Sequence, residues 1–368
     1  MNQNPYLCKT MSTTKINIRN LSFVELTEKV ISIGEKKFRA KQVYEWIWKK
    51  GARSFSDMHN VSKKITEALE TDYFLDCLTI SDEQKSNDGT IKVAFKSFDG
   101  HITEGVLIPT ENRVTACISS QVGCSLACVF CATGRLKLMR NLSAGEVYDQ
   151  VLLLTKLSED AYGQKLTNIV LMGMGEPLLN YKNVIQGCKM ISSEDGLNIS
   201  PKRITLSTAG IAKMITKLGD DNVKFNLALS LHAANDKKRS EIMEINDTNS
   251  LDVLAESLIY FHHKTGSRVT FEYIIFKDFN DTLKDARELA NFCKNTPVKV
   301  NIIEYNPIDA GIYEQADPEK VDAFAAYLES LNIIVHVRRS RGKDIDAACG
   351  QLANKNGAIE LKDRSLKG

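Results

Sequence analysis

Residues 114–134 read Val-Thr-Ala-Cys117-Ile-Ser-Ser-Gln-Val-Gly-Cys124-Ser-Leu-Ala-Cys128-Val-Phe-Cys131-Ala-Thr-Gly134, and this stretch decides the fold. It begins as a β-branched apolar run and ends in three cysteines with C-x3-C-x2-C spacing. Thiolates this close together can fold around one metal centre. Structural zinc sites normally have four protein ligands, often as separated C-x2-C pairs, and no matching pair follows here. The spacing therefore favours a [4Fe–4S] cluster that leaves one iron open.

Downstream of the cysteines, short apolar runs alternate with helical stretches. The runs are 114–120, 168–173, 203–208, 225–231, 269–276 and 298–305, with a last run at 333–339. Near-continuous apolar strands separated by helices are typical of a parallel sheet. Six such units predict an α/β fold, a partial (β/α)6 barrel of the TIM type. Most of their polar interruptions follow the strands, where barrel enzymes place their active sites.

Two local patterns flank the first unit. Ser143 and Glu146 form a capping-box pattern, so a helix is expected to begin just beyond the cysteine loop. Upstream, residues 91–97 and 103–109 predict a hairpin across the Asp99-Gly100 turn.

The bulk composition fits a globular chain with a small appendage. Of its 368 residues, 43% are hydrophobic and 26% are charged. No run approaches the roughly 18 apolar residues that a membrane helix needs, and the N-terminus has no apolar signal core. We therefore expect a cytoplasmic protein. We predict a helical accessory domain over 1–90, a barrel with its leading hairpin over 91–352, and a tail over 353–368.

Positive charge is concentrated near the N-terminus. Between Lys36 and Lys64 there are nine basic residues and two acidic ones, a surplus of seven, although the whole chain carries a formal charge of only +2. A cationic segment beside an acidic remainder indicates that a polyanion is bound by the former. Tyr44, Trp46 and Trp48 lie within this segment; we expect them mainly in the core, with base stacking as the alternative.

The cysteine loop, placed after the first strand of a partial barrel, resembles that of the radical S-adenosylmethionine superfamily. The resemblance implies that Cys124, Cys128 and Cys131 bind the cluster and that its open iron binds S-adenosylmethionine. One electron then cleaves the cofactor to a 5′-deoxyadenosyl radical. Polar residues end several other strands, and the resemblance implies cofactor contacts there. These positions are Gly175, Glu176, Ser207, Ser230, Leu231, His232 and Asn306.

A more specific resemblance spans residues 104–352. The matching runs, in chain order, are 117–124 (CISSQVGC), 173–181 (GMGEPLLNY), 229–233 (LSLHA), 300–307 (VNIIEYNP) and 338–352 (RRSRGKDIDAACGQL). They resemble the RlmN-type adenosine C2 methyltransferases. The resemblance implies action on 23S rRNA at the peptidyl-transferase centre, and on tRNA next to the anticodon in many members. We further expect a monomer that receives electrons from a donor such as flavodoxin or ferredoxin.

The same resemblance assigns two further cysteines. Adenine C2 is an sp² carbon without a nucleophilic lone pair, so simple displacement on a methyl sulfonium cannot methylate it. Cys349 would accept a methyl group as a thiolate, and the cofactor radical would convert that group into a methylene radical that adds to C2. Cys117 would then attack the Cys349 sulfur, forming a transient disulfide that releases the product. Glu104 occupies the position of the base that takes the C2 proton.

Three alternatives stay open at this point. The related C8-methylating resistance enzymes share both cysteines, but their GEP turn usually reads GEA, so Pro177 favours C2. A non-catalytic RNA-binding protein could use a cluster or zinc as a structural staple. A radical enzyme acting on a small molecule would leave the cationic segment without a purpose.

Overall fold

The computed structural model describes residues 15–309 and 311–353, and its contacts divide the chain into two units after Cys77. The smaller unit consists of β1 (Ile16–Asn17), α1 (Phe23–Ser32), α2 (Phe38–Trp48), α3 (Lys63–Asp72) and β2 (Tyr73–Phe74). Strands β1 and β2 pair in parallel, which joins the two ends of the unit. This unit is the predicted helical domain.

The small unit has its own apolar core. Helix α1 begins with a capping box between Ser22 and Glu25, and Val30, Val43 and Ile65 are fully buried. Trp48 is 2% exposed, so it belongs to the core as expected. Tyr44 and Trp46 are only half-buried, and the Lys50 ammonium lies 4.4 Å from the centre of the Trp46 ring. These two aromatics therefore lie at the edge of the core, beside exposed basic side chains.

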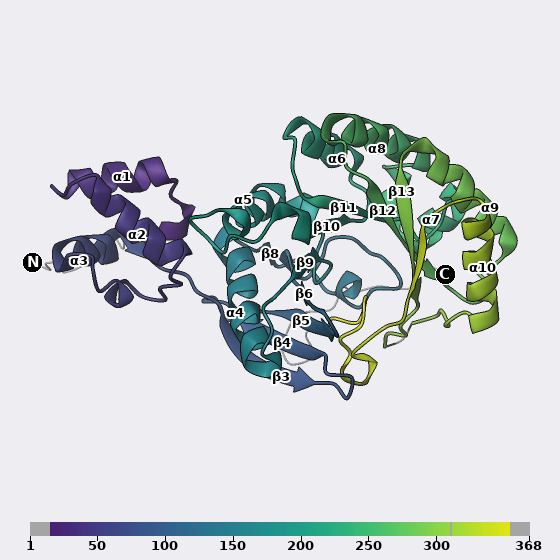
Figure 1. Cartoon of the computed structure of the whole chain (residues 1–368), viewed down its shortest axis with the longest axis horizontal. Helices are drawn as coiled ribbons and strands as arrows, with labels where there is room; N and C mark the ends of the chain where they lie inside the picture. The colour runs from purple at the N-terminus through teal and green to yellow at the C-terminus, as the bar shows by residue number, and fades with distance from the viewer. Residues whose placement is uncertain (1–14, 310, 354–368) are drawn as a thin grey trace, which may run out of the picture. The chain divides into compact units, whose positions relative to one another are not determined.

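The larger unit is built on a ten-stranded sheet whose strands follow the chain order almost without exception (Figure 1). Across the sheet they are β14 (Val335–Arg338), β13 (Val298–Glu304), β12 (Val269–Ile275), β11 (Asn226–Ser230), β10 (Ile204–Thr208), β9 (Asn168–Leu171), β6 (Arg113–Cys117), β5 (Ile102–Thr110), β4 (Ile91–Lys96) and β3 (Thr79–Lys85). Strands β6 and β9–β14 are parallel. Each predicted run contains one of them, and the predicted partial barrel is confirmed, with β14 as an added parallel strand.

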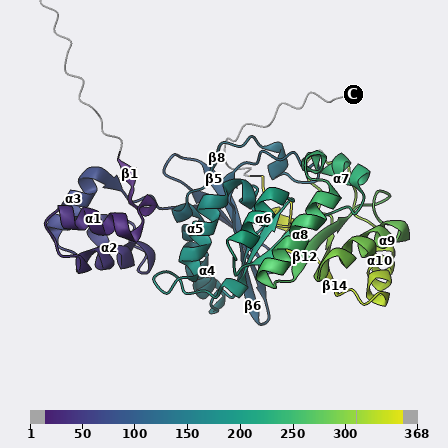
Figure 2. The same cartoon turned by 90° about the horizontal axis from the view of Figure 1, so that it is seen from above.

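The helices connect the parallel strands along the outside of the curved sheet (Figures 1 and 2). They are α4 (Ala144–Tyr162), α5 (Tyr181–Ser192), α6 (Ala212–Asp220), α7 (Asp236–Ile242), α8 (Leu251–Thr265), α9 (Leu283–Phe292) and α10 (Pro318–Ser330). The capping box between Ser143 and Glu146 begins α4 as expected. Within the described residues, no helix has the length and apolar character needed to cross a bilayer.

The antiparallel end of the sheet corrects one prediction. Strands β4 and β5 form the expected hairpin, with Gly100 in a left-handed turn at φ 84°. The predicted domain boundary after residue 90 is wrong, because β3 pairs with β4 and belongs to the large sheet. Strand β3 reads TISDEQK and has no buried residue. A polar edge strand of this kind lacks the apolar pattern that identifies a strand in a sequence.

The C-terminal segment links the two ends of the sheet. After β14 it runs to the turn between β3 and β4, where the Ser86 hydroxyl donates to Asp344 at 2.6 Å. The Gly342 N–H donates to the Asp88 carboxylate at 2.9 Å, and the Arg341 guanidinium lies 3.5 Å from the same group. Residues 341–344 therefore bridge the gap that the open sheet leaves, and they bring the following residues inside the barrel.

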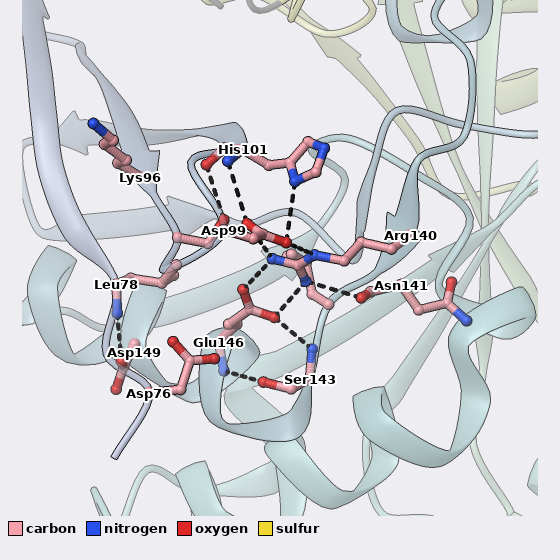
Figure 3. A network of polar contacts seen from close by, with 12 residues as sticks. Asp76, Leu78, Lys96, Asp99, His101, Arg140, Asn141, Ser143, Glu146 and Asp149 are labelled. Atoms are coloured by element: carbon pink, nitrogen blue, oxygen red, sulfur yellow. Dashed lines mark hydrogen bonds and ion pairs between the residues drawn. The ribbon is translucent and has the colours of Figure 1, made fainter. Parts of the chain in front are cut away.

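The cysteine loop has a narrow neck formed by β7 (Gln121–Val122) and β8 (Arg140–Asn141), which pair antiparallel. Figure 3 shows the Arg140 guanidinium between the carboxylates of Asp99, in the β4–β5 turn, and Glu146, in α4. The two guanidinium nitrogens lie 2.7 and 2.8 Å from the Glu146 oxygens. Burial opposes the charge on Asp99, but hydrogen bonds from Arg140 and His101 hold its pKa below the usual range. Arg140 thus ties the neck to the hairpin and to α4.

Replacing Arg140 by methionine should destabilise the protein. The change keeps the side-chain length but leaves Glu146, whose side chain is 1% exposed, without its cation. We expect a loss of about 2 kcal/mol, below the value for a fully buried pair because Arg140 is partly exposed. Chemical denaturation followed by circular dichroism measures this loss. The surface pair Lys217–Asp221 provides the control: Lys217→Met should change stability by no more than about 0.5 kcal/mol.

Candidate active site

A cavity, called the upper cavity below, opens at the carboxyl ends of the parallel strands. It is lined by Cys124, Cys128 and Cys131 of the loop, by Gly175 and Glu176 after β9, by Ser207 in β10, and by Ser230 and His232 at the end of β11. The structure therefore brings together the three predicted cluster ligands and five of the seven predicted cofactor residues. Barrel enzymes place their active sites at this end of the strands.

Apolar residues between the cysteines dock the loop onto the strand ends. The Phe130 ring packs edge-on against His232, with ring centres 4.7 Å apart, and it also contacts Phe276. The Val129 N–H donates to the Ile242 carbonyl at 3.1 Å. Gly123 begins the loop at φ 77°, where an added Cβ would lie 1.9 Å from the Lys137 carbonyl oxygen, so only glycine fits. The loop is thus fixed by packing, with its thiols directed into the cavity.

The three thiols are close enough to influence one another. Burial, together with the neighbouring thiols of Cys131 and Cys124, raises the pKa of Cys128. Within the described residues no group of side chains is arranged as for a single metal ion, and a multi-iron cluster holds its thiolates further apart than one ion does. Metal binding displaces thiol protons, so a bound cluster would hold these three cysteines as thiolates. The donor set fits a [4Fe–4S] cluster with three protein ligands.

The GEP turn connects two strand ends rather than offering a free carboxylate. Glu176 is buried, and its carboxylate accepts hydrogen bonds from Ala209 N–H at 2.7 Å and Leu178 N–H at 2.9 Å. Burial raises the pKa of Glu176 despite these bonds. Gly175 adopts φ 93°, and an added Cβ would lie 2.5 Å from the Gln121 side chain. What this turn offers to a ligand is therefore its backbone, held in place by the Glu176 side chain.

Of the remaining predicted cofactor residues, three line the cavity at the carboxyl ends of the strands and two do not. The hydroxyls of Ser207 and Ser230 are 3.4 Å apart across β10 and β11. His232 has φ 56°, and burial lowers its pKa to about 3, so it is neutral and its Nδ1 accepts from Ile274 N–H. Leu231 is fully buried and lines neither large cavity. Asn306 also lies outside both lining sets, and it donates to the Cys349 carbonyl at 3.3 Å.

A second cavity, called the lower cavity below, lies on the inner side of the sheet toward the amino ends of the strands. Its basic lining residues are Arg113, Lys299, Arg338, Arg339 and Arg341. Arg339 pairs with Glu304 and Arg341 with Asp88. Among the described residues, no ion pair within 4.0 Å involves Arg113, Lys299 or Arg338. Three uncompensated cations at one mouth favour an anionic ligand there.

Cys349 lines both cavities, and Cys117 lines the second. Two hydrogen bonds fix the Cys349 segment against the cysteine loop: Ala132 N–H donates to the Gly350 carbonyl at 2.7 Å, and the Thr133 hydroxyl donates to the Leu352 carbonyl at 2.6 Å. Cys349 retains exposed surface, but desolvation by the surrounding protein, and next the Glu272 carboxylate, raise the pKa of its thiol to about 11. Burial and the Cys349 thiol raise the pKa of Cys117. The structure therefore places the two thiols near each other, beside the cysteine loop.

Both thiols are free in this structure. The sequence-based expectation of a disulfide is thus not met by the described state. A disulfide would have to form transiently between Cys117 and Cys349.

Glu104 is 6% exposed and lies on β5. Its carboxylate is 3.9 Å from the Lys92 ammonium, and neither cavity includes it in its lining. It lies two residues from Val106, which pairs with Cys117 across β5 and β6. Glu104 is therefore close to the Cys117 strand position but not exposed in the cavities.

Three polar residues of the site were not predicted. Glu272 and Asn301 lie opposite each other on β12 and β13, and Arg239 of α7 is fully buried. The Arg239 guanidinium donates to the carbonyls of Leu231 and Ser230, to the carbonyl of Ala209, and to the side chain of Asn246. Glu272 had a detectable signal, because it is the one charged residue in an otherwise largely apolar strand. Asn301 had a weaker signal, because its strand also contains Lys299 and Glu304.

The geometry and the comparisons agree on the class of protein. Residues 118–293 match the family model of the radical SAM superfamily. A crystal structure of a radical SAM methyltransferase from Sphaerobacter thermophilus superimposes with a TM-score of 0.86 at 38% identity, covering 92% of this chain and 99% of that one. The protein is a radical S-adenosylmethionine enzyme, with a [4Fe–4S] cluster and S-adenosylmethionine as its cofactors.

The particular family follows from full-length relatives. Residues 16–74 match the model described as the ribosomal RNA large subunit methyltransferase N-terminal domain. The chain is 58% identical over 354 residues to a probable dual-specificity RNA methyltransferase RlmN of Cytophaga hutchinsonii, covering 95% of this chain and 97% of the relative. It is 52% identical to the protein of the same name from Flavobacterium johnsoniae, covering 95% and 100%. The chain belongs to the RlmN family of RNA methyltransferases.

Replacing Cys128 by alanine should prevent stable cluster binding. Anaerobic reconstitution of the unchanged protein should give a brown protein with about four irons per chain. The variant should lose most of that iron and the visible absorption, because two thiolates cannot hold the cluster firmly. Iron analysis and absorption spectroscopy measure both. Cys188, a buried thiol of α5 outside both cavities, provides the control, since Cys188→Ala should keep its iron. A Cys128→Ala protein with a full complement of iron would contradict the assignment.

Proposed function

We propose that the protein methylates C2 of adenosine in 23S rRNA at the peptidyl-transferase centre, and in tRNA next to the anticodon. The observation that supports this most is the position of Cys349 and Cys117. Both lie beside the cysteine loop, and both line the cavity that bears the uncompensated cations. An enzyme that only transferred a methyl group to a nucleophile would need neither thiol.

In this proposal the two thiols act in sequence. The Cys349 thiolate attacks the methyl group of S-adenosylmethionine; a carbon–sulfur bond forms and S-adenosylhomocysteine leaves. When bound, the cluster and a second S-adenosylmethionine supply the one-electron chemistry that removes a hydrogen atom from the new methyl group. The Cys349 methylene carbon then bonds to C2, and the adduct loses the C2 proton to a base and one electron to the same one-electron system. Cys117 attacks the Cys349 sulfur, the carbon–sulfur bond breaks, and a disulfide forms as the methylated base is released.

Glu104 stays in the proposal as the group that takes the C2 proton. It is buried near the Cys117 strand position, and Lys92, 3.9 Å away, reduces the cost of its negative charge. To reach the base, its carboxylate would have to turn toward the cavity, since it does not line it in the described state.

RNA binding is proposed for two cationic surfaces. In the small unit, all nine basic residues between Lys36 and Lys64 except Arg39 are exposed. In the large unit, Arg113, Lys299 and Arg338 surround the lower cavity. Phosphate contacts of this kind provide affinity without sequence readout. The target base must leave its stack to reach Cys349. We further propose that the protein acts as a cytoplasmic monomer, reduced by a donor such as flavodoxin or ferredoxin.

The rival reaction is methylation of C8 of the same base, which would use the same two thiols. Pro177, which follows Glu176 and begins the short helix over 177–180, favours C2 because the corresponding turn of the C8-methylating enzymes usually reads GEA.

The position of the new methyl group tests the proposal. The reconstituted protein is incubated anaerobically with a reductant, S-adenosylmethionine and separate fragments of 23S rRNA and tRNA, and the digested RNA is examined by mass spectrometry. We expect 2-methyladenosine in both. 8-Methyladenosine would support the rival reaction, and cofactor cleavage without RNA methylation would contradict both.

Variants of the two thiols should fail in different ways. Cys349→Ala should keep its iron but accept no methyl group, so its intact mass stays unchanged after incubation with S-adenosylmethionine. Cys117→Ala should accept the methyl group and add to RNA, but the product should remain attached because no thiol can attack the Cys349 sulfur. The adduct is seen as a nuclease-sensitive increase in mass. Multiple turnover by Cys117→Ala would disprove its role; Cys293→Ala serves as a control outside both cavities.

A further inference from the structure

Glu272 is a buried carboxyl group at the junction of the two cavities. It lies in the middle of β12, where every residue is buried, and it is 5% exposed. It lines both the upper and the lower cavity, as does Cys349. An ionisable group in such a strand lowers stability unless it is paired or hydrogen-bonded. The presence of a glutamate at this buried position therefore calls for an explanation from the site.

The surroundings of Glu272 fix the orientation of its carboxyl group but supply no ion-pair partner within 4.0 Å among the described residues. Asn301 faces it directly in the register of β12 and β13, and the Asn301 side-chain N–H donates to Glu272 Oε1 at 2.7 Å. The cations that face it, Lys299 and Arg338, are not within ion-pair distance in the described structure. Burial raises the pKa of Glu272, and Arg338 and Asn301 only partly oppose this. The group therefore holds a proton more readily than an ordinary glutamate and can donate a hydrogen bond.

The position of Glu272 relative to Cys349 limits what it can contact. The upper cavity contains the cysteine loop and most of the predicted cofactor residues, so the cofactor occupies that side. A target base must approach Cys349 from the other side, through the lower cavity. Glu272 and Cys349 both lie at the junction of the two cavities, and Glu272 is near enough to the Cys349 thiol to affect its pKa. A base that Cys349 can reach is therefore also within reach of Glu272.

The chemistry of C2 gives this contact a purpose. C2 is flanked by the ring nitrogens N1 and N3, both hydrogen-bond acceptors. A carbon radical next to sulfur is electron-rich, so it adds faster to a carbon that has lost electron density. A hydrogen bond donated to either flanking nitrogen withdraws density from C2 and stabilises the charge that develops on the ring as the new bond forms.

We propose that the Glu272 carboxyl group, oriented by Asn301, donates a hydrogen bond to N1 or N3 of the target adenine while Cys349 reaches C2. This rests on the proposed function and adds to it a residue that activates the base. The proton stays on Glu272 during this contact, so the hydrogen bond itself requires no additional acid or base. Glu272 would be a catalytic residue, and Asn301 a positioning residue.

Atomic changes in the RNA test the contact directly. Substrate fragments carry adenosine, 1-deazaadenosine or 3-deazaadenosine at the target position, and the single-turnover rate is measured for the wild type and Glu272→Ala. Loss of a ring nitrogen slows any such reaction. The decisive quantity is therefore the coupling, which is the factor by which this loss slows the wild type divided by the factor by which it slows Glu272→Ala. For one nitrogen, its loss should slow the wild type about tenfold more than it slows the variant, as for a hydrogen bond worth about 1.4 kcal/mol. Glu272→Gln keeps a donor and should retain most of the coupling.

Matched variants separate orientation from general damage. Asn301→Ala should reduce the coupling because Glu272 loses its fixed partner. Asn168 provides the control, since its side-chain oxygen is also buried without a partner in the described structure, yet it lines neither cavity. Asn168→Ala should leave the coupling unchanged. Glu272→Ala should still accept a methyl group on Cys349, which shows that the variant folds and binds S-adenosylmethionine.

The outcomes are distinguishable. A coupling below about threefold at both nitrogens, in a protein that methylates adenosine normally, overturns the Glu272 assignment alone. A tenfold loss of S-adenosylmethionine affinity without coupling makes Glu272 a cofactor contact and overturns it as well. If the wild type forms no 2-methyladenosine, the proposed function fails, and this inference fails with it.

Discussion

The site depends on the contact between the C-terminal segment and the cysteine loop. The hydrogen bonds from the Ala132 N–H to the Gly350 carbonyl and from the Thr133 hydroxyl to the Leu352 carbonyl join segments more than 200 residues apart. Without them Cys349 would have no fixed position, because the adjoining chain is not part of a strand or an α-helix. The bridge from residues 341–344 to the β3–β4 turn sets the path that makes these bonds possible. The same segment thus closes the open sheet and places the thiol beside the three cluster ligands.

A barrel used in this way must keep its interior open and polar. TIM barrels normally fill the inside with layers of bulky branched side chains, whereas here the inner side contributes Thr205, Thr270, Glu272, Lys299 and Asn301 to a cavity. Stability must then come from the outer side, where the helices cover the sheet (Figure 2). It also comes from local ties such as the Arg140 network, which fixes the neck of the cysteine loop.

Much of the architecture could be predicted because its signals are local. The parallel strands appear as apolar runs, the hairpin as two runs around Asp99-Gly100, and the start of α4 as the pair Ser143 and Glu146. The domain boundary could not be predicted in the same way. Strand β3 is polar on both sides, and only its hydrogen bonds to β4 make it part of the sheet. The side-chain roles of Glu176 and Leu231 also differ from a simple ligand, since both are buried among backbone groups.

The sequence by itself determined that Cys124, Cys128 and Cys131 are confined to one short loop, and this spacing predicts them as the cluster ligands. Together with the family resemblance it also predicted that Cys117 and Cys349 are reactive thiols. Only the tertiary structure decided that these two thiols lie in one cavity, and that Glu272 and Asn301 face each other at the junction. The reason is physical: spacing along the chain constrains only near neighbours, whereas strand register and the path of the last segment arise from packing of the whole barrel.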